Sequence, residues 1–191
     1  MSAKTLFSEA SYVLLDRDGV INRKAPEGSY IGRWRDFELL SGVDAAIAAL
    51  NRSGRRVLVV SNQRGIALGL YSRSDVEDTH RRLQALLAAG GARIDAFYYC
   101  PHDMNECDCR KPRTGLFDAA LRDFPDLAAQ QGAVIGDSVS DIEFARSLGL
   151  PSIFIRSDAA TRSPGADRGE ELADAVSSSL AEAVAEYFQR G

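Results

Sequence analysis

The sequence predicts an α/β protein with a doubly wound, mainly parallel sheet. Five short apolar runs, each bounded by turn residues, alternate with segments in which apolar residues recur at helical spacing. Strands buried on both faces read as continuous apolar runs, so this alternation indicates a parallel sheet with helices on both sides. The length of 191 residues, 45% of them hydrophobic, suits one compact domain, and we expect a single domain over residues 1–191.

The expected strands and helices follow one another along the chain. The apolar runs predict strands at 12–15, 57–60, 96–99, 133–135 and 152–155. Helical periodicity predicts helices at 43–50, 75–89, 116–124 and 141–148, followed by the capping glycines Gly54, Gly90 and Gly149.

Two of the helical segments carry further signals. Ser74, followed three residues later by Glu77, predicts a capping box at the start of the helix at 75–89. We expect the leucines of this helix to face inward: Leu83, Leu86 and Leu87. Near the end of the chain, apolar residues recur every four positions from Leu172 to Phe188, which predicts one terminal helix covering the core.

One long irregular segment interrupts this regular pattern. Residues 22–39 contain a proline, two glycines and the only tryptophan of the chain, Trp34. Loops of this length are frequently functional. Trp34 and Phe37 therefore either seal an edge of the sheet or contact a substrate.

The composition excludes several classes of function. A net charge of −4 argues against the basic face that nucleic-acid binding needs. The N-terminal stretch fits neither a signal peptide nor an anchor, and no segment has membrane-spanning length. All three cysteines fall in one ten-residue window, whereas a disulfide framework ties distant segments together. We therefore expect a cytoplasmic monomer with no nucleic acid or membrane partner.

Two carboxylates stand where the first predicted strand ends. Asp16 and Asp18 are two residues apart, so an extended backbone aims both side chains to the same face. Ligands of open α/β sheets bind at this edge. An isolated pair of this kind is also typical of an Asp-rich turn, but Asn62, Lys111 and Asp137 follow other predicted strands. The combination indicates phosphoryl chemistry by carboxylates and magnesium.

Elimination leads to the same chemistry. The chain has only two histidines, His80 within a helix and His102 beside the cysteines, so a Ser-His-Asp or Cys-His hydrolase lacks a free base. It also lacks the GxxxxGK[ST] phosphate loop. A phosphomonoester beside three aspartates needs cations. Magnesium suits a few carboxylates with phosphate oxygens, and Lys111 and Arg110 supply further positive charge.

Four motifs resemble those of the haloacid dehalogenase-like phosphatases: LLDRDGVIN, VVSNQRG, CRKP at 109–112, and IGDSVSD. They occur in order over nearly the whole chain. The resemblance implies a Rossmann-like core, and the absence of a large insertion implies that there is no large cap domain. It also implies that Asp16 attacks phosphorus to form an aspartyl phosphate, while Asp18 protonates the leaving oxygen and later deprotonates water.

The same resemblance assigns the supporting residues. Ser61 and Lys111 would hold the phosphoryl oxygens. Magnesium would be bound by the carboxylates of Asp16 and Asp137 and by the backbone carbonyl of Asp18. Asp141 either supports these ligands or caps a helix at the surface. The structural alternatives are a strand-end turn at Ser61, a solvated Lys111 and a helix N-cap at Asp137.

The cysteine cluster predicts a zinc site in the loop at 100–109. Three thiolates and one imidazole suit a closed tetrahedral site with a structural role, and the alternative is a loop with free thiols. The four ligands are Cys100, His102, Cys107 and Cys109. The loop directly precedes Arg110 and Lys111, so zinc would fix both cations over the active site.

This zinc loop resembles that of two phosphatase families, the D-glycero-D-manno-heptose 1,7-bisphosphate 7-phosphatases and the histidinol-phosphatases. SNQRGIALG at 61–69 and DFELLSGV at 36–43 favour the heptose family, which implies release of the 7-phosphate from a sugar bisphosphate and a role in heptose biosynthesis for lipopolysaccharide. Besides the catalytic residues, the resemblance implies substrate contacts from Arg17, Ser29, Tyr30, Asn62, Gln63, Arg64 and Arg110.

Two alternatives stay open beside the heptose phosphatase. One is a histidinol-phosphate phosphatase, and the other is a zinc-stabilised binding module without turnover. The module is disfavoured because all four principal site residues are present: Asp16, Asp18, Lys111 and Asp137. The sequence departs from the heptose family at Ser138, where a lysine often stands, at Ser41, which replaces a proline, and in the short spacing from His102 to Cys107.

Overall fold

The computed structural model describes residues 3–156 and 161–188. Residues 1–2, 157–160 and 189–191, which the predicted domain includes, lie outside the described part. One six-stranded sheet has the order β3-β2-β1-β4-β5-β6, and every neighbouring pair is parallel. The strands are β1 (Tyr12–Leu15), β2 (Arg56–Asn62), β3 (Ala96–Cys100), β4 (Gly132–Gly136), β5 (Ser152–Ile155) and β6 (Ala175–Ser177). The predicted doubly wound parallel sheet is confirmed, and β6 is an addition.

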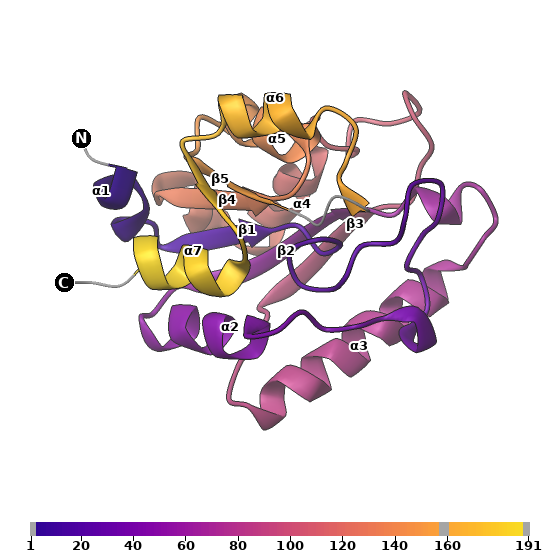
Figure 1. Ribbon diagram of the computed structural model, residues 1–191, viewed down its shortest axis with the longest axis horizontal. Helices are drawn as coiled ribbons and strands as arrows, with labels where there is room; N and C mark the ends of the chain where they lie inside the picture. Colours follow the sequence, from indigo (N-terminus) through magenta and orange to yellow (C-terminus); the bar gives the residue numbers. More distant parts are fainter. Residues whose placement is uncertain (1–2, 157–160, 189–191) are drawn as a thin grey trace.

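Helices cover both faces of this sheet (Figure 1). One face packs against α1 (Ala3–Ser8), α2 (Val43–Arg52), α3 (Arg73–Ala89) and α7 (Leu180–Tyr187). The other face carries α4 (Gly115–Asp123), α5 (Val139–Leu148) and α6 (Ala166–Leu172). Gly90 and Gly149 are C-cap residues, as predicted. In α2 the C-cap is Ser53, and Gly54 follows it with φ of +81°.

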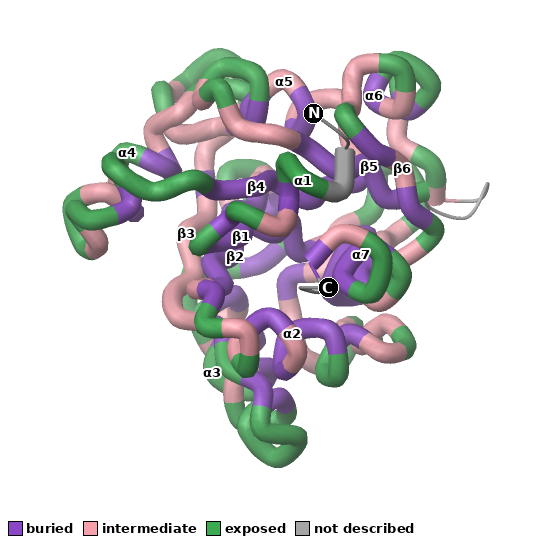
Figure 2. Tube along the Cα trace, turned by 90° about the vertical axis from the view of Figure 1, so that its left-hand side faces the viewer, coloured by how far each residue is buried: buried purple, intermediate pink, exposed green. Residues whose placement is uncertain are grey.

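The core follows from the alternation of side chains along each strand. In β1, Val13 and Leu15 face the helix layer of α2 and α7, while Tyr12 and Leu14 face that of α4 and α5. All four are buried. The central strands therefore form the buried middle of the molecule, which Figure 2 shows in purple. Strands packed on both faces give a rigid base for the loops at their carboxyl ends.

The start of α3 differs from the prediction. Its N-cap is Ser72, whose side chain accepts a hydrogen bond from the Asp75 backbone N–H, and the Asp75 carboxylate accepts one from the Ser72 N–H. The predicted capping box of Ser74 and Glu77 is therefore wrong by two residues. The pairs Ser72/Asp75 and Ser74/Glu77 have the same spacing, so the sequence alone does not distinguish them. In the structure Ser72 has the extended backbone of an N-cap residue.

Leu86 is also misplaced by the prediction. It is 46% exposed, whereas Leu83 and Leu87 are fully buried. The buried side of α3 also includes Val76 and His80. At 100° per residue, Leu86 lies at the margin of the stripe that these residues form, so it turns to solvent.

The predicted terminal helix is wrong. In its place α6 ends at Leu172, β6 pairs with β5, and α7 begins only at Leu180. The Ser179 side chain accepts a hydrogen bond from the Glu182 N–H, and the Glu182 carboxylate accepts hydrogen bonds from Ser178. These serines favour a helix start over helix continuation because their side chains bind the free backbone groups of the first turn.

The segment at 22–39 forms a loop whose two ends meet at a bridge between Asn22 and Leu39. Trp34 stacks on Phe37 with ring centroids 5.2 Å apart, and both pack against the core on the face of α2 and α3. Neither lines the cavity described below. The structure therefore favours a packing role over substrate contact for this pair, on a face of the sheet and not at its edge. None of the helices in the described ranges is long and apolar enough to cross a membrane.

Strand order places the functional end of the sheet. The chain moves outward from β1 through β2 to β3, and then crosses to β4 on the other side of β1. A crevice opens at the carboxyl ends of strands where the order reverses in this way. Asp16 directly follows β1, and Asp137 directly follows β4. The sheet thus brings two carboxylates to one crevice although about 120 residues separate them in the chain.

Candidate active site

A cavity of about 540 Å³ lies over this crevice. Loops that follow the first four strands line it, together with residues 161–164. Predicted site residues in its wall are Asp16, Asp18, Ser29, Tyr30, Asn62, Arg64, Arg110, Lys111 and Asp137. Three predicted residues lie behind the wall: Arg17, Ser61 and Gln63, each at most 1% exposed. The cavity wall also includes residues that sequence reasoning missed: Lys24, Ser140, Arg162 and Ser163.

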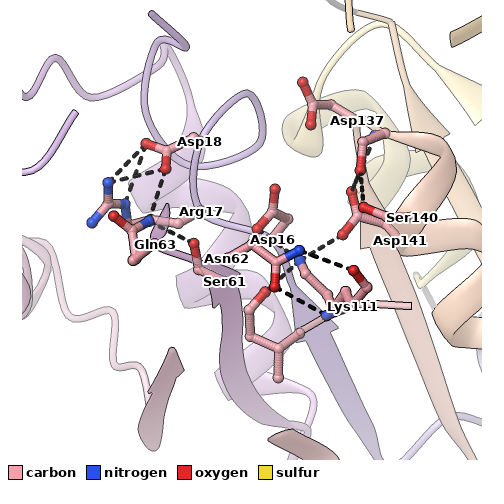
Figure 3. Close-up of polar contacts among 12 residues, drawn as sticks. Asp16, Arg17, Asp18, Ser61, Asn62, Gln63, Lys111, Asp137, Ser140 and Asp141 are labelled. Carbon is pink, nitrogen blue, oxygen red and sulfur yellow. Dashed lines mark hydrogen bonds and ion pairs between the residues drawn. The ribbon is translucent and has the colours of Figure 1, made fainter. Parts of the chain in front are cut away.

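Lys111 is the buried cation of this site (Figure 3). Its Nζ donates to Asp16 Oδ1 at 2.8 Å, to Asp141 Oδ1 at 2.5 Å and to the carbonyl oxygen of Val60 at 2.6 Å. Only 2% of its side chain is exposed. Burial by itself lowers the pKa of Lys111, but the two carboxylates outweigh this and raise it above its usual value. The alternative of a solvated lysine is therefore wrong.

Asn62 fixes the backbone that carries this lysine. Its side-chain Oδ1 accepts a hydrogen bond from the Lys111 N–H at 3.0 Å, and its Nδ2 donates to the Lys111 carbonyl at 3.2 Å. Two hydrogen bonds from one amide side chain hold the peptide in a defined orientation. Asn62 therefore ties the end of β2 to the segment that follows the cysteine cluster.

Asp141 has two roles at once. Its Oδ2 accepts hydrogen bonds from the Ser138 N–H at 3.1 Å and the Ser138 hydroxyl at 2.6 Å, which completes a capping box at the start of α5. Its Oδ1 binds Lys111. Asp141 is 1% exposed. It does take part in capping a helix, but the cap is buried and not at the surface as the alternative predicted. This residue joins the helix terminus to the buried lysine.

Burial raises the pKa of two further carboxyl groups. The pKa of Asp16 rises to about 6, mainly because of burial, which outweighs the opposing effect of Lys111. The pKa of Asp137 rises to about 7 for the same main reason, against the opposing effect of Lys24. Ligand atoms of Asp16, Asp137 and Asp141 all lie within 4.8 Å of one another. Three carboxylates this close favour an additional cation.

One oxygen in this group has no partner. Asp137 Oδ1 is buried and accepts no hydrogen bond among the described residues. Its other oxygen, Oδ2, accepts from Lys24 Nζ at 2.7 Å. A buried carboxylate oxygen without a partner is costly unless it binds something, and a hard divalent cation prefers such oxygens. The carboxylate group therefore fits a metal ion.

Three donors hold Asp18 apart from Asp16. Arg17 Nη2 donates to both Asp18 oxygens at 2.9 and 3.0 Å, Asn22 Nδ2 at 2.8 Å and Gln63 Nε2 at 3.0 Å. In Figure 3 the Asp18 carboxylate points toward Arg17 and Gln63. Arg17 and Gln63 were expected to contact substrate, but the structure places both in the hydrogen-bond network of Asp18. Gln63 Nε2 also donates to Ser61 Oγ at 2.8 Å.

Four residues of the loop at 100–109 could hold a second metal. The Cys107 Sγ lies 3.5 Å from Cys100 Sγ and 3.3 Å from Cys109 Sγ, and the His102 Nδ1 lies 3.3 Å from Cys109 Sγ. Zinc bonds of about 2.0–2.3 Å in a tetrahedron place ligand atoms roughly 3.3–3.8 Å apart. The predicted ligand set therefore comes together at the right spacing.

An ion pair connects this loop to the cavity. Arg64 Nε donates to Asp103 Oδ1 at 2.5 Å, and Asp103 directly follows His102 in the loop. Arg64 comes from η2 (Arg64–Ile66), just after β2. This ion pair therefore links the cavity residue Arg64 to the loop at 100–109.

His80 is a buried histidine behind the site. It is 6% exposed, its ring stacks on Phe97 at 4.4 Å, and its Nε2 has no partner in the part of the chain that is described. Burial, helped by the positive charge of Arg17, lowers the pKa of His80 to about 3. The unfolded chain takes up this proton near the usual histidine pKa of 6.5, so the free energy of unfolding falls as pH drops from about 6.5 toward 3.

Replacing His80 by Phe is expected to remove this loss. When the pH is lowered from 7.5 to 5, the free energy of unfolding of the native protein should fall by about 2 kcal/mol more than that of the variant. The reason is that each pH unit below the unfolded histidine pKa costs the native protein about 1.4 kcal/mol. Urea denaturation at the two pH values measures the difference. The carboxylates contribute equally to the pH dependence of both proteins and cancel in the comparison. If the free energy of unfolding changes with pH by the same amount in both proteins, the assignment to His80 is wrong.

Comparison with known proteins agrees with this carboxylate and lysine chemistry. A family model described as HAD-hydrolase-like, the haloacid dehalogenase-like class, matches residues 108–183. A D-glycero-alpha-D-manno-heptose-1,7-bisphosphate 7-phosphatase of Mycobacterium bovis is 45% identical over 137 residues, which cover 71% of this chain and 72% of that protein. The D-glycero-beta-D-manno-heptose-1,7-bisphosphate 7-phosphatase of Vibrio cholerae is 36% identical over 93% of this chain and 96% of its own.

A solved structure shows the same fold over nearly the whole chain. The D,D-heptose 1,7-bisphosphate phosphatase of B. bronchiseptica, complexed with magnesium and phosphate, has a TM-score of 0.75 and 26% identity over 92% of this chain and 96% of that one. Together with the close sequence relatives, this confirms the resemblance seen in the four motifs. The chain belongs to the heptose-1,7-bisphosphate 7-phosphatase family of haloacid dehalogenase-like hydrolases.

Proposed function

We propose that the protein is a magnesium-dependent phosphatase that releases the 7-phosphate of D-glycero-D-manno-heptose 1,7-bisphosphate through an aspartyl phosphate on Asp16. The main support is the buried Lys111, which bridges Asp16 and Asp141 beside the unpartnered Asp137 Oδ1. A site with a buried ammonium group and an unpartnered carboxylate oxygen suits a phosphoryl group whose charge must be neutralised.

Asp16 is held in position to attack. Lys111 binds its Oδ1 and fixes the carboxylate, so an oxygen of Asp16 forms the new bond to phosphorus while the bond to the sugar oxygen breaks. Asp18, which lines the same cavity, gives its proton to the leaving sugar oxygen. It then takes a proton from the water that attacks the aspartyl phosphate, and this second step releases phosphate and restores Asp16.

The carboxylates of Asp16 and Asp137 and the backbone carbonyl of Asp18 would hold magnesium. Its positive charge supports negative charge that develops on the phosphoryl oxygens. The donor set fits this ion because it offers a few carboxylate oxygens and leaves room for phosphate oxygens and water. Ser61, buried beside Gln63, orients the network behind the phosphoryl site.

Arg110 is the best candidate for the non-reacting phosphate. It lines the cavity, and its Nη1 is buried with no hydrogen-bond partner among the described residues. A guanidinium nitrogen in this state favours an anionic ligand. Arg64, Ser29 and Tyr30 line the same cavity and would contact the sugar.

The decisive test is phosphate release from defined substrates. We expect kcat/KM to be highest for one anomer of the heptose bisphosphate, much lower for histidinol phosphate, and dependent on magnesium. Higher kcat/KM on histidinol phosphate would favour the alternative family, and no release from any substrate would favour a binding module. Arg110→Met should lower kcat/KM for the bisphosphate but not for heptose 7-phosphate, which lacks the second phosphate.

We further propose that zinc orders the loop at 100–109. Cys109→Ser should abolish zinc binding and lower Tm, because structural zinc contributes on the order of 10 kcal/mol to a small folded loop. It should also raise KM more than it lowers kcat, since Arg64 and Arg110 lose their support. Metal analysis, thermal unfolding and steady-state kinetics measure these effects.

Met104→Ser provides the matched control. Met104 lies in the same loop, is 59% exposed and is not a member of the predicted ligand set. This variant should keep zinc, Tm and KM. Full zinc content in Cys109→Ser, or a Tm equal to that of the native protein, would contradict the structural zinc site.

The use of the thiols for zinc rather than disulfides also supports a cytoplasmic location. The monomeric state stays a prediction.

A further inference from the structure

Most carboxylate oxygens around the proposed magnesium site already have a partner. Both oxygens of Asp141 are taken, Oδ1 by Lys111 and Oδ2 by Ser138. Asp16 Oδ1 also binds Lys111, and Asp137 Oδ2 binds Lys24. Within the described residues, Asp16 and Asp137 therefore each keep a single oxygen for a metal ion.

Lys24 approaches Asp137 from outside the carboxylate cluster. Its Nζ donates to Asp137 Oδ2 at 2.7 Å and also donates to the Ser163 hydroxyl. In the described part of the chain Lys24 forms no ion pair with Asp16 or Asp141, whose oxygens instead surround Lys111. Its ammonium group thus lies beside the metal site and does not fill it.

The backbone of Gly19 lies close to the same oxygen. A Cβ placed on Gly19 would lie 2.3 Å from Asp137 Oδ2, so the backbone of Gly19 packs closely against this carboxylate. Gly19 has φ of +93°, a conformation that other residues rarely adopt. Close packing against Gly19 and the hydrogen bond from Lys24 together restrict rotation of the Asp137 carboxylate.

We propose that Lys24 keeps Asp137 a one-oxygen ligand and thereby makes the site selective for magnesium over calcium. The inference rests on the proposed magnesium site. Mg²⁺ requires six ligands at about 2.0–2.1 Å and uses few protein oxygens, whereas Ca²⁺ accepts six to eight at about 2.3–2.6 Å and readily takes both oxygens of one carboxylate. With Oδ2 bound to Lys24, Asp137 offers Ca²⁺ only one.

The two ions carry equal charge, and this makes a sharp test possible. Loss of the Lys24 charge alone would strengthen the binding of both ions by a similar factor and leave the ratio of their Kd values unchanged. Loss of the hold on Oδ2 should favour Ca²⁺ specifically. In Lys24→Met we therefore expect the ratio of Kd(Ca²⁺) to Kd(Mg²⁺) to fall by about tenfold, or 1.4 kcal/mol.

Calorimetric titration of the purified, zinc-loaded protein with Mg²⁺ and then Ca²⁺ measures both constants without an activity assay. Arg23→Met is the matched control, because it removes one positive charge at the neighbouring position, where the side chain pairs with Glu38 at the surface. Its Kd ratio should equal that of the native protein. Thermal unfolding checks that Lys24→Met stays folded, as expected for a side chain that is 25% exposed.

The outcomes separate this inference from the proposed function. A Kd ratio in Lys24→Met equal to that of the native protein overturns the selectivity role, even if both ions bind more tightly. A fall in the ratio that Arg23→Met reproduces overturns it as well. If the native protein binds no Mg²⁺, the magnesium site of the proposed function fails, which is a different result.

Discussion

Asp16→Asn is expected to lower kcat by a factor on the order of 10⁴ or more, a typical cost of losing a nucleophile. An amide oxygen is a far weaker nucleophile than a carboxylate and does not form the aspartyl phosphate. The fold should persist, because Asn has nearly the same shape and its oxygen can still accept the hydrogen bond from Lys111 Nζ. Steady-state phosphate release, with thermal unfolding as a check, measures both effects.

Asp44→Asn is the control for this substitution. Asp44 lies on the exposed side of α2, outside the cavity wall, and its replacement makes the same change of charge and shape. It should leave kcat unchanged. Beryllium fluoride, which mimics an aspartyl phosphate, should bind the native protein in the presence of magnesium and not Asp16→Asn. Turnover by Asp16→Asn at the native rate would rule out Asp16 as the nucleophile.

Local patterns were sufficient to predict the central strands and the residues that follow them. Asp16 and Asp137 were correctly expected at strand ends, because a buried parallel strand reads as an apolar run and the polar residue after it marks the edge of the sheet. Lys111 is expected near them because a phosphomonoester beside three aspartates needs positive charge. The fold of the sheet then explains why residues so distant in the chain meet.

Nonlocal contacts account for the main errors. The spacing of Leu172, Val176 and Leu180 fits a helix, but residues 175–177 gain more by pairing with β5 than a helix interrupted by serines would give. Lys24 gave no signal in the sequence, because its contact with Asp137 depends on the path of the loop after β1. Similarly, Arg17 stands between Asp16 and Asp18 in the sequence, but its guanidinium group donates to the Asp18 carboxylate and does not line the cavity.

Lys111→Met is expected to cost both stability and activity. It leaves Asp16 and Asp141 buried without a cation, and removing one partner of a buried charge pair costs roughly 3–5 kcal/mol. Activity should fall below detection, since Asp16 then loses the ammonium group that fixes its carboxylate and whose positive charge lies beside the phosphoryl site. Urea denaturation of the metal-free protein and phosphate release measure the two losses.

A second substitution shows whether uncompensated charge causes the instability. Asp141→Asn in the Lys111→Met background removes one of the two buried negative charges while keeping an oxygen to accept hydrogen bonds from Ser138. The double variant should regain roughly 1–3 kcal/mol relative to Lys111→Met and stay inactive. If instability came instead from lost packing of the lysine side chain, Asp141→Asn would add to the loss. Recovery of stability without recovery of activity would thus separate the electrostatic role of Lys111 in folding from its role toward the phosphoryl group.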